Sequence, residues 1–172
     1  MSDSNSHNQA DLIHVRSYQA EDQPAVSWLY EHGRLAGHEQ PNDTAADIDN
    51  IVDAYQAYER AHFWVAEVEG QVVGMVGVAE DEPDLAEVRR LRVHPDYRNQ
   101  GIAYKLMESA LSFCHHHGYL KVILDTAFHE GPALEVFERF AFQHNRTRSV
   151  GGKELLEFYL DLYREPRKEG DD

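Results

Sequence analysis

The sequence predicts one α/β domain, a sandwich in which a mixed, mostly antiparallel sheet of about six or seven strands is flanked by about four helices. The chain has 172 residues, a length typical of a single domain. Hydrophobic residues make up 42% of it and aromatic residues 10%, which favours a packed core over disorder. Strand-like and helix-like apolar spacings also follow one another along the chain.

The first part of this domain is expected to contain a short strand and two helices. Ile13 to Val15 is a strand candidate, and Asp22 and Pro24 open a helix that should end near Gly33. Thr44 can cap a second helix. The apolar positions of that second helix are Ile48, Ile51, Val52 and Tyr55.

A hairpin and a third strand candidate come next. The runs HFWVAEV and QVVGMVGVAED flank Glu69-Gly70, a dipeptide typical of a tight hairpin turn. The segment AEVRRLRV, from Ala86 to Val93, alternates sharply. Strict alternation would place Glu87, Arg89, Leu91 and Val93 on one face of the strand, and Val88, Arg90 and Arg92 on the other.

The rest of the domain alternates between helix and strand. A helix is expected from about Gln100 to His117, with Gly118 ending it. The strand YLKVILDTA, a short helix LEVFERFAF that enters a loop, and a final strand ELLEFYLDLY follow. A strand, a helix and a second strand in this order make one parallel crossover, so we expect a mixed sheet.

Residues 11–163 are expected to form this domain, between a disordered N-terminus (1–10) and a flexible charged tail (164–172). The single cysteine, Cys114, excludes an internal disulfide and favours a reducing compartment. No apolar run approaches the ~20 residues of a membrane span, and the first residues lack the pattern of a signal peptide. We therefore expect a cytoplasmic protein without a membrane partner.

The distribution of charge is more informative than its total. A formal net charge of −15 argues against general binding to nucleic acid. Between Ala86 and Lys105, however, five basic residues oppose two acidic ones. Any anionic ligand is therefore expected at this local basic patch.

The segment LRVHPDYRNQGIAYK, from Leu91 to Lys105, has the order of elements that makes an anion site. A strand ends, a tight turn follows, and a helix opens at Gly101, so the unpaired amides of its first turn can cradle a phosphate. An ordinary surface turn is the alternative interpretation. The phosphate-loop and dinucleotide-loop patterns are both absent, which indicates a phosphate carrier of another kind.

The run from Arg98 to Ala103, RNQGIA, resembles the R/Q-x-x-G-x-G/A signature of the GCN5-related N-acetyltransferases (GNAT). The preceding L-x-V-x-P-x-x-R is present as well. The resemblance extends from about Phe63 to Phe142, and the segment FCHHHGYLKVILDT is similar to the camello-like members. It implies a GNAT-like sandwich that uses acetyl-CoA as cosubstrate without a metal.

The resemblance also implies how acetyl-CoA is bound, between the strand that ends at Val93 and the strand from Val122 to Asp125. The residues implied in binding are Leu91, Arg92 and Val93, which pair with pantetheine, and Arg98, Asn99, Gln100, Gly101, Ile102 and Ala103 around the pyrophosphate. A bulge usually opens the strand and leaves the Leu91 amide facing the thioester carbonyl. A donor placed there is worth ~3 to 4 kcal/mol.

An acceptor amine must lose a proton before it attacks. In the family a Glu or His on this strand often acts through ordered water, and Glu87 lies four residues before Leu91. The alternative is a surface carboxylate paired with Arg89 or Arg90. His129 and Glu130 are the runner-up bases.

The family commonly protonates the leaving thiolate with a tyrosine, but Phe137 stands at that position. Water could replace it, and so could Tyr104, Tyr119 or Tyr159, among which the sequence does not choose. This departure keeps open a second function, a non-catalytic sensor or partner-binding module that binds acetyl-CoA or CoA.

Two further features of the sequence bear on metal binding and on the charge of the acceptor. The run from Cys114 to His117 spreads its side chains ~100° apart on a helix, so it cannot converge on one ion. The first 60 residues carry 11 acidic and 3 basic side chains, which would attract a cationic acceptor if they line its groove and otherwise form a solvated face. The sequence thus predicts acetyl transfer to a primary amine in a ternary complex, and a homodimer is compatible with it.

Overall fold

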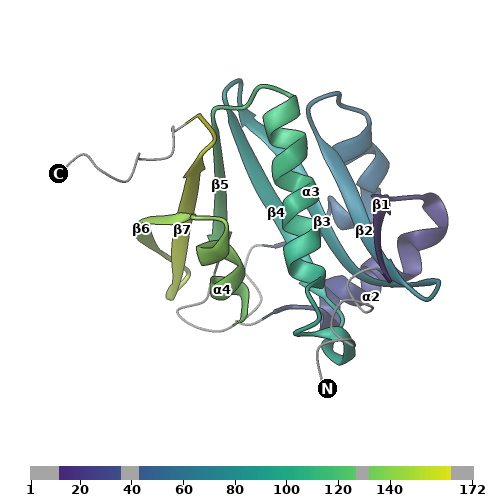
Figure 1. Ribbon diagram of the computed structural model, residues 1–172. Coiled ribbons are helices and arrows are strands. Elements are labelled where there is room, and N and C mark those ends of the chain that lie inside the picture. The colour runs from purple at the N-terminus through teal and green to yellow at the C-terminus, as the bar shows by residue number, and fades with distance from the viewer. Residues whose placement is uncertain (1–11, 36–42, 127–131, 164–172) are drawn as a thin grey trace, which may run out of the picture.

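One seven-stranded sheet organises the computed structural model, which describes residues 12–35, 43–126 and 132–163. The strand order is β1-β2-β3-β4-β5-β7-β6 (Figure 1). The strands are β1 (Ile13–Ser17), β2 (His62–Val68), β3 (Gln71–Glu82), β4 (Leu85–Val93), β5 (Lys121–Thr126), β6 (Gln143–Val150) and β7 (Lys153–Asp161). The main helices are α2 (Gln23–His32), α3 (Ile102–His116) and α4 (Pro132–Arg139).

The sheet is mixed, as predicted. β4 and β5 pair in parallel, and every other neighbouring pair of strands described here is antiparallel. The β2–β3 hairpin turns at Glu69 and Gly70, whose φ angles of 50° and 80° are those of the expected tight turn. The crossover from β4 to β5 runs through α3, which places the start of this helix beside the end of β4.

Strand β6 was not predicted, since a loop was expected between the short helix and the last strand. Its sequence, QHNRTRSV, has no apolar alternation because it forms the edge of the sheet and pairs only through β7 among the described residues. β7 therefore has β5 on one side and β6 on the other. It offers no unpaired edge to a second copy of the chain.

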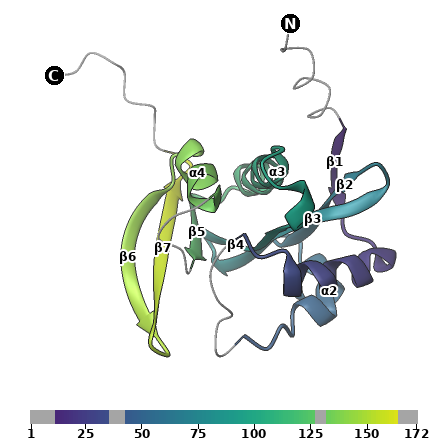
Figure 2. The ribbon, with the colours of Figure 1, turned by 90° about the horizontal axis from the view of Figure 1, so that it is seen from below.

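Helices cover both faces of the sheet (Figure 2). On one face α3 and α4 pack against a core that includes Val88, Val93 and Leu106. On the other, α2 packs with two short helical segments, the 3₁₀ turn η2 (Ile48–Asn50) and the π-helical turn η3 (Val52–Gln56). Their buried side chains form a second core cluster: Tyr18, Val26, Leu29, Ile48, Ile51, Tyr55, Phe63, Val65, Met75 and Ala79.

The helix expected after Thr44 thus consists of η2 and η3 rather than a regular α-helix. Thr44 does not cap it: the N-cap residue of η2 is Asp47, which makes no side-chain capping hydrogen bond. The Ala45 N–H donates to Asp43 Oδ1 at 3.0 Å. Val52 is 53% exposed, whereas Ile48 and Tyr55 are buried. By contrast, α2 ends at the predicted Gly33, whose N–H donates to Leu29 O at 2.7 Å. No helix among the described residues has the length and apolar character needed to cross a membrane.

Candidate active site

The two parallel strands of the sheet separate towards their C-terminal ends. β4 and β5 pair from Leu85 and Lys121 to Glu87 and Ile123. Beyond that point β4 continues to Val93 and β5 to Thr126 without further pairing between them. The carboxyl ends of neighbouring parallel strands are a common place for ligands in α/β proteins, and here they leave the last residues of β4 open on the β5 side.

A β-bulge interrupts β4 in this open stretch. Met75 of β3 faces Arg92 and Gly77 faces Arg89, so Val76 alone is opposed by both Arg90 and Leu91. Arg90 has a φ of 59°, in the left-handed region. A bulge of this kind inserts one residue into the strand and reverses the alternation beyond it.

The reversal corrects the predicted faces of β4. Ala86 and Val88 pack into the core beneath α3, and beyond the bulge Leu91 and Val93 pack there too. Glu87 therefore does not share a face with Leu91 or Val93, as uninterrupted alternation had predicted. It lies instead on the face covered by α2 and η3.

A pocket of about 210 Å³ lies where α3 begins. Six residues singled out in the sequence line it: Val93, Arg98, Asn99, Gly101, Ile102 and Ala103. Leu91, Arg92 and Gln100 do not line it: the first two precede it on β4, and Gln100 is exposed. The other lining residues are Leu35, Tyr97, Tyr104, Glu135, Val136 and Arg139.

The backbone of the loop leaves the start of α3 exposed to a ligand. Asn99 and Gly101 have φ angles of 60° and 86°, which turn the chain sharply into the helix. Gly101 is the N-cap residue, and no side chain caps the helix there. A Cβ at Gly101 would meet no heavy atom within 4 Å. The first amides of α3 therefore face open space at the positive end of the helix dipole.

Arg98 ties this loop to the end of α2. Its Nη2 donates to Arg34 O at 2.6 Å, and its Nε is buried without a hydrogen-bond partner. The guanidinium thus brings a positive charge to the pocket while holding the loop in place.

The pocket residues on α4 were missed in the sequence, where this helix was considered only for its packing. The signal available in the sequence was their spacing. At this spacing, Glu135, Val136 and Arg139 lie next to one another on one side of a helix. Arg139 lies 5.9 Å from the centroid of the Tyr104 ring. Two arginines, Arg98 and Arg139, therefore reach a pocket that also contains the N-terminus of a helix.

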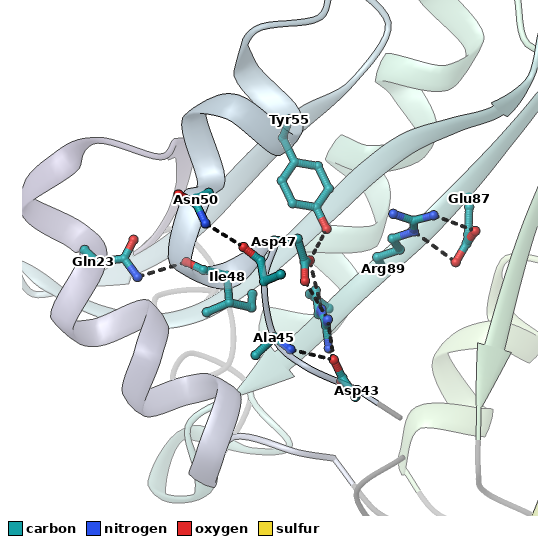
Figure 3. Close-up of polar contacts among 11 residues, drawn as sticks. Gln23, Asp43, Ala45, Asp47, Ile48, Asn50, Tyr55, Glu87 and Arg89 are labelled. Atoms are coloured by element: carbon teal, nitrogen blue, oxygen red, sulfur yellow. Dashed lines mark hydrogen bonds and ion pairs between the residues drawn. The ribbon is translucent and has the colours of Figure 1, made fainter. Parts of the chain in front are cut away.

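Glu87 is paired with Arg89 (Figure 3). Arg89 Nε lies 3.0 Å from one carboxylate oxygen and Nη2 donates to the other at 3.1 Å. A surface carboxylate paired with Arg89 or Arg90 was the expected alternative to a role as base. A paired carboxylate can still bind water. The runner-up bases His129 and Glu130 lie outside the described residues.

A network of two carboxylates and one arginine joins β4 to the segment that contains η2 and η3, and Figure 3 labels Asp43, Asp47 and Tyr55 in it. Arg90 donates to both oxygens of Asp43 and both of Asp47, and the Tyr55 hydroxyl donates to Asp47 at 2.6 Å. Hydrogen bonds from Arg90 hold the pKa of Asp43 well below its usual range. Burial raises the pKa of Asp47, but the bonds from Arg90 and Tyr55 outweigh burial and lower it overall.

The structure places Phe137 and the three candidate proton-donating tyrosines in different surroundings. Phe137 is 5% exposed and packs with Phe142 and Phe158, at ring distances of 6.1 and 5.7 Å. The Tyr119 hydroxyl donates to Arg60 O at 2.6 Å, and the Tyr159 hydroxyl donates to Gln143 at 2.8 Å. Of the three tyrosines considered in the sequence, Tyr104 is the one that lines the pocket.

Cys114 and the neighbouring histidines show no sign of a metal site. Cys114 is fully buried, and burial raises the pKa of its thiol to about 12. In the part of the chain that the structure describes, no group of three or more His, Cys, Asp or Glu side chains is placed to hold an ion.

The sequence and the fold both match known proteins. Residues 24–142 match the family model described as Acetyltransferase (GNAT) family. The chain is 36% identical over 103 residues to the probable N-acetyltransferase camello of Xenopus tropicalis, a match that covers 59% of this chain and 47% of that protein. It is 30% identical over 140 residues to the protein described as uncharacterized N-acetyltransferase YjgM of Escherichia coli (strain K12), a match that covers 76% of this chain and 81% of that one.

The chain spans about half the length of the camello protein. Among solved structures, that of yncA from Salmonella typhimurium, described as a putative acetyltransferase with its cofactor acetyl-CoA, superimposes with a TM-score of 0.75 at 18% identity. That match covers 90% of this chain and 96% of the other.

Proposed function

Because the chain belongs to the acetyltransferase (GNAT) family, we propose that it moves an acetyl group from acetyl-CoA to a primary amine, by direct attack within a ternary complex. The observation that carries the proposal is the separation of β4 from β5 after Glu87 and Ile123. It exposes the bulged end of β4 next to the pocket at the start of α3.

The residues around the pocket fit an acyl-CoA. The amides from Asn99 to Ala103 and the two guanidinium groups of Arg98 and Arg139 suit its pyrophosphate. The backbone of Leu91 to Val93, which β5 does not pair with, suits the amide groups of pantetheine.

Residues of β4 would also take part in the transfer of the acetyl group. A lysine-like amine of pKa ~10.4 is mostly protonated near pH 7, so its neutral form costs about 4 to 5 kcal/mol. Glu87 would accept the proton through a water molecule, and the Leu91 amide would donate to the carbonyl oxygen as negative charge develops there. Holding both substrates together supplies much of the remaining acceleration.

The leaving thiol needs no side-chain acid in this proposal. A thiol of pKa ~8.5 is a tolerable leaving group, and the buried Phe137 has no proton to give. The same residue favours the second candidate function, a module that binds acetyl-CoA or CoA without turnover.

Calorimetry with acetyl-CoA tests the proposal first. We expect binding by the parent chain and a loss of at least 10-fold in affinity for Gly101→Glu, because the new side chain enters the open space where the pyrophosphate would lie. Unchanged affinity in that variant would exclude this site. Release of free thiol with a panel of amines then separates the two functions, since binding without release supports the module.

A further inference from the structure

The face of β4 covered by α2 carries an excess of guanidinium groups. Arg90 and Arg92 both lie over the Tyr30 ring, 5.2 and 5.9 Å from its centroid. Arg34 pairs with Arg92 in an isolated β-bridge. The carboxylates bound within this group are Asp43 and Asp47, and both bind Arg90.

Arg92 has no such partner. Its one hydrogen bond to a described residue runs from Nη1 to Leu91 O at 3.3 Å, and its Nε is buried without any. Burial, together with the neighbouring Arg34 and Arg90, lowers the pKa of Arg92 to about 10. No carboxylate among the described residues forms an ion pair with it.

The other carboxylates near this part of the sheet are already bound to different arginines. Glu87 is paired with Arg89. The pairs on the next strands are Asp125 with Arg148 and Glu157 with Arg146. A desolvated guanidinium without an ion-pair partner is costly. Among the described residues, Asp43 lies near enough to Arg92 to act on its charge but forms its ion pair with Arg90, so no described carboxylate pairs with Arg92.

The position of Arg92 indicates which ligand would compensate it. Arg92 directly follows Leu91, so their Cα atoms are about 3.8 Å apart. Its side chain lies on the α2 face, and it does not line the pocket at the start of α3. An anion bound to Arg92 would therefore lie close to the reacting carbonyl but away from the coenzyme phosphates.

We propose that the acceptor is a small amine that carries a carboxylate, and that Arg92 binds this carboxylate. The proposal rests on the acetyl transfer proposed above. A guanidinium forms two parallel hydrogen bonds with a carboxylate. Because Arg92 directly follows Leu91 on β4, a molecule that carries both an amine and a carboxylate, as an amino acid does, would place its amine on the side of the carbonyl that Leu91 faces. A cationic acceptor would instead meet Asp43 and Asp47 already bound to Arg90, and an unpaired Arg92.

Matched acceptors test the proposal by kinetics. We would compare phenylalanine, methionine and glutamate with their α-amides, and include spermidine as a cationic amine. At equal concentrations of the neutral amine, the free acids are expected to have a kcat/KM roughly 10- to 100-fold higher, the range for a lost charged hydrogen bond. The rates must be compared in this way because an α-amide lowers the pKa of the neighbouring amine and so makes more neutral amine available.

The variant Arg92→Met retains the length of the side chain and removes its charge. It is expected to raise KM for the free acids roughly 10- to 100-fold more than KM for the amides. Because pantetheine would meet Arg92 through its backbone, calorimetry with acetyl-CoA separately measures any effect of the variant on the coenzyme. Arg60→Gln is the control, since Arg60 lies beside Tyr119 and Pro83, at the other end of β4. It should leave every kinetic constant unchanged.

A binding experiment makes the test independent of turnover. With CoA present, 3-phenylpropionate should raise Tm in the parent and not in Arg92→Met, whereas the uncharged 3-phenylpropanamide should raise it in neither. Carboxylates without an Arg92-dependent effect, or amides and spermidine acetylated as well as the free acids, would overturn the inference. Failure to bind acetyl-CoA would overturn the proposed function instead.

Discussion

Glu87 occupies the last paired position of β4 before the strands separate, and Arg89 holds both of its oxygens. A carboxylate fixed in this way cannot rotate freely, but it can accept a proton relayed by water from the open side. Its location on the α2 face, which the bulge determines, places it on the same side as Arg92 and away from the pocket at the start of α3.

The role of Glu87 as base predicts the effect of Glu87→Gln. We expect kcat to fall roughly 100-fold or more, in the range for loss of a general base, and the pH profile of kcat/KM to change. Arg89→Gln is the matched control, because it removes the ion-pair partner and keeps the carboxylate of Glu87. It should keep most of the parent kcat, and an unchanged profile in Glu87→Gln would exclude this residue as the base.

At the scale of elements, two glycines with similar backbone angles can be compared. The comparison separates the binding role of the turn before α3 from the backbone strain that a side chain would cause there. Gly70 and Gly101 have φ angles of 80° and 86°, and a Cβ at either would meet no atom within 4 Å. Both therefore need the left-handed region without any packing constraint. They differ in that Gly101 lines the pocket and Gly70 lies in the β2–β3 turn.

We expect Gly70→Ala and Gly101→Ala to destabilise the fold by a similar amount, about 1 to 2 kcal/mol, the cost of a side chain in that region. Only Gly101→Ala should weaken the binding of acetyl-CoA, because its new methyl group and any shift of φ disturb the amides of the first turn of α3. Chemical denaturation and calorimetry measure the two effects. Equal loss of coenzyme affinity in both variants would contradict a binding role for the loop.

Most elements were predictable because their apolar residues alternate or repeat at helical spacing. The β2–β3 hairpin, β4, α3, β5 and β7 all lie where the sequence placed them. β6 was missed because an edge strand needs no apolar face. The irregular η2 and η3 were missed because apolar spacing does not distinguish a regular helix from 3₁₀ and π turns.

The site was predictable to a smaller extent. The loop from Arg98 to Ala103 could be found from its glycine and its helix start, but Arg139 comes to it through tertiary packing. The bulge in β4 depends on how β3 pairs with it, so the sequence of β4 alone does not indicate that Glu87 and Leu91 face opposite sides.

At the scale of the whole molecule, ion pairs determine how stability depends on pH. Asp22, Asp43, Asp47 and Glu157 all have a lowered pKa in the folded chain. Each contributes stability that is present above its unfolded pKa of ~4 and is lost as the pH falls through the folded value. Asp125, whose pKa burial raises, contributes with the opposite sign.

Arg90→Met tests this pH dependence. At pH 7 we expect a loss of about 2 to 4 kcal/mol in the free energy of unfolding, somewhat below the cost of breaking a fully buried pair. The loss should shrink as the pH falls below 4, because the unfolded chain takes up protons on Asp43 and Asp47 before the folded parent does, and the stability that Arg90 confers through them is lost. Arg60→Gln removes an exposed pair with Glu80 and should cost less than 1 kcal/mol. A pH-independent effect of Arg90→Met, followed by denaturation from pH 7 to 3, would contradict the role of this network.

The extra residue in β4 also has a consequence for how this protein can diversify. On either side of the bulge, one set of positions (86, 88, 91 and 93) is buried beneath α3, and the set between them (87, 89, 90 and 92) faces α2. In the second set, Glu87 is the proposed base and Arg90 binds Asp43 and Asp47, so neither is expected to vary freely. If Arg92 binds the acceptor as proposed, a mutation at this one position can alter the choice of acceptor while the first set continues to maintain the core. A single strand thus carries positions that maintain the fold beside a position that can change with the substrate.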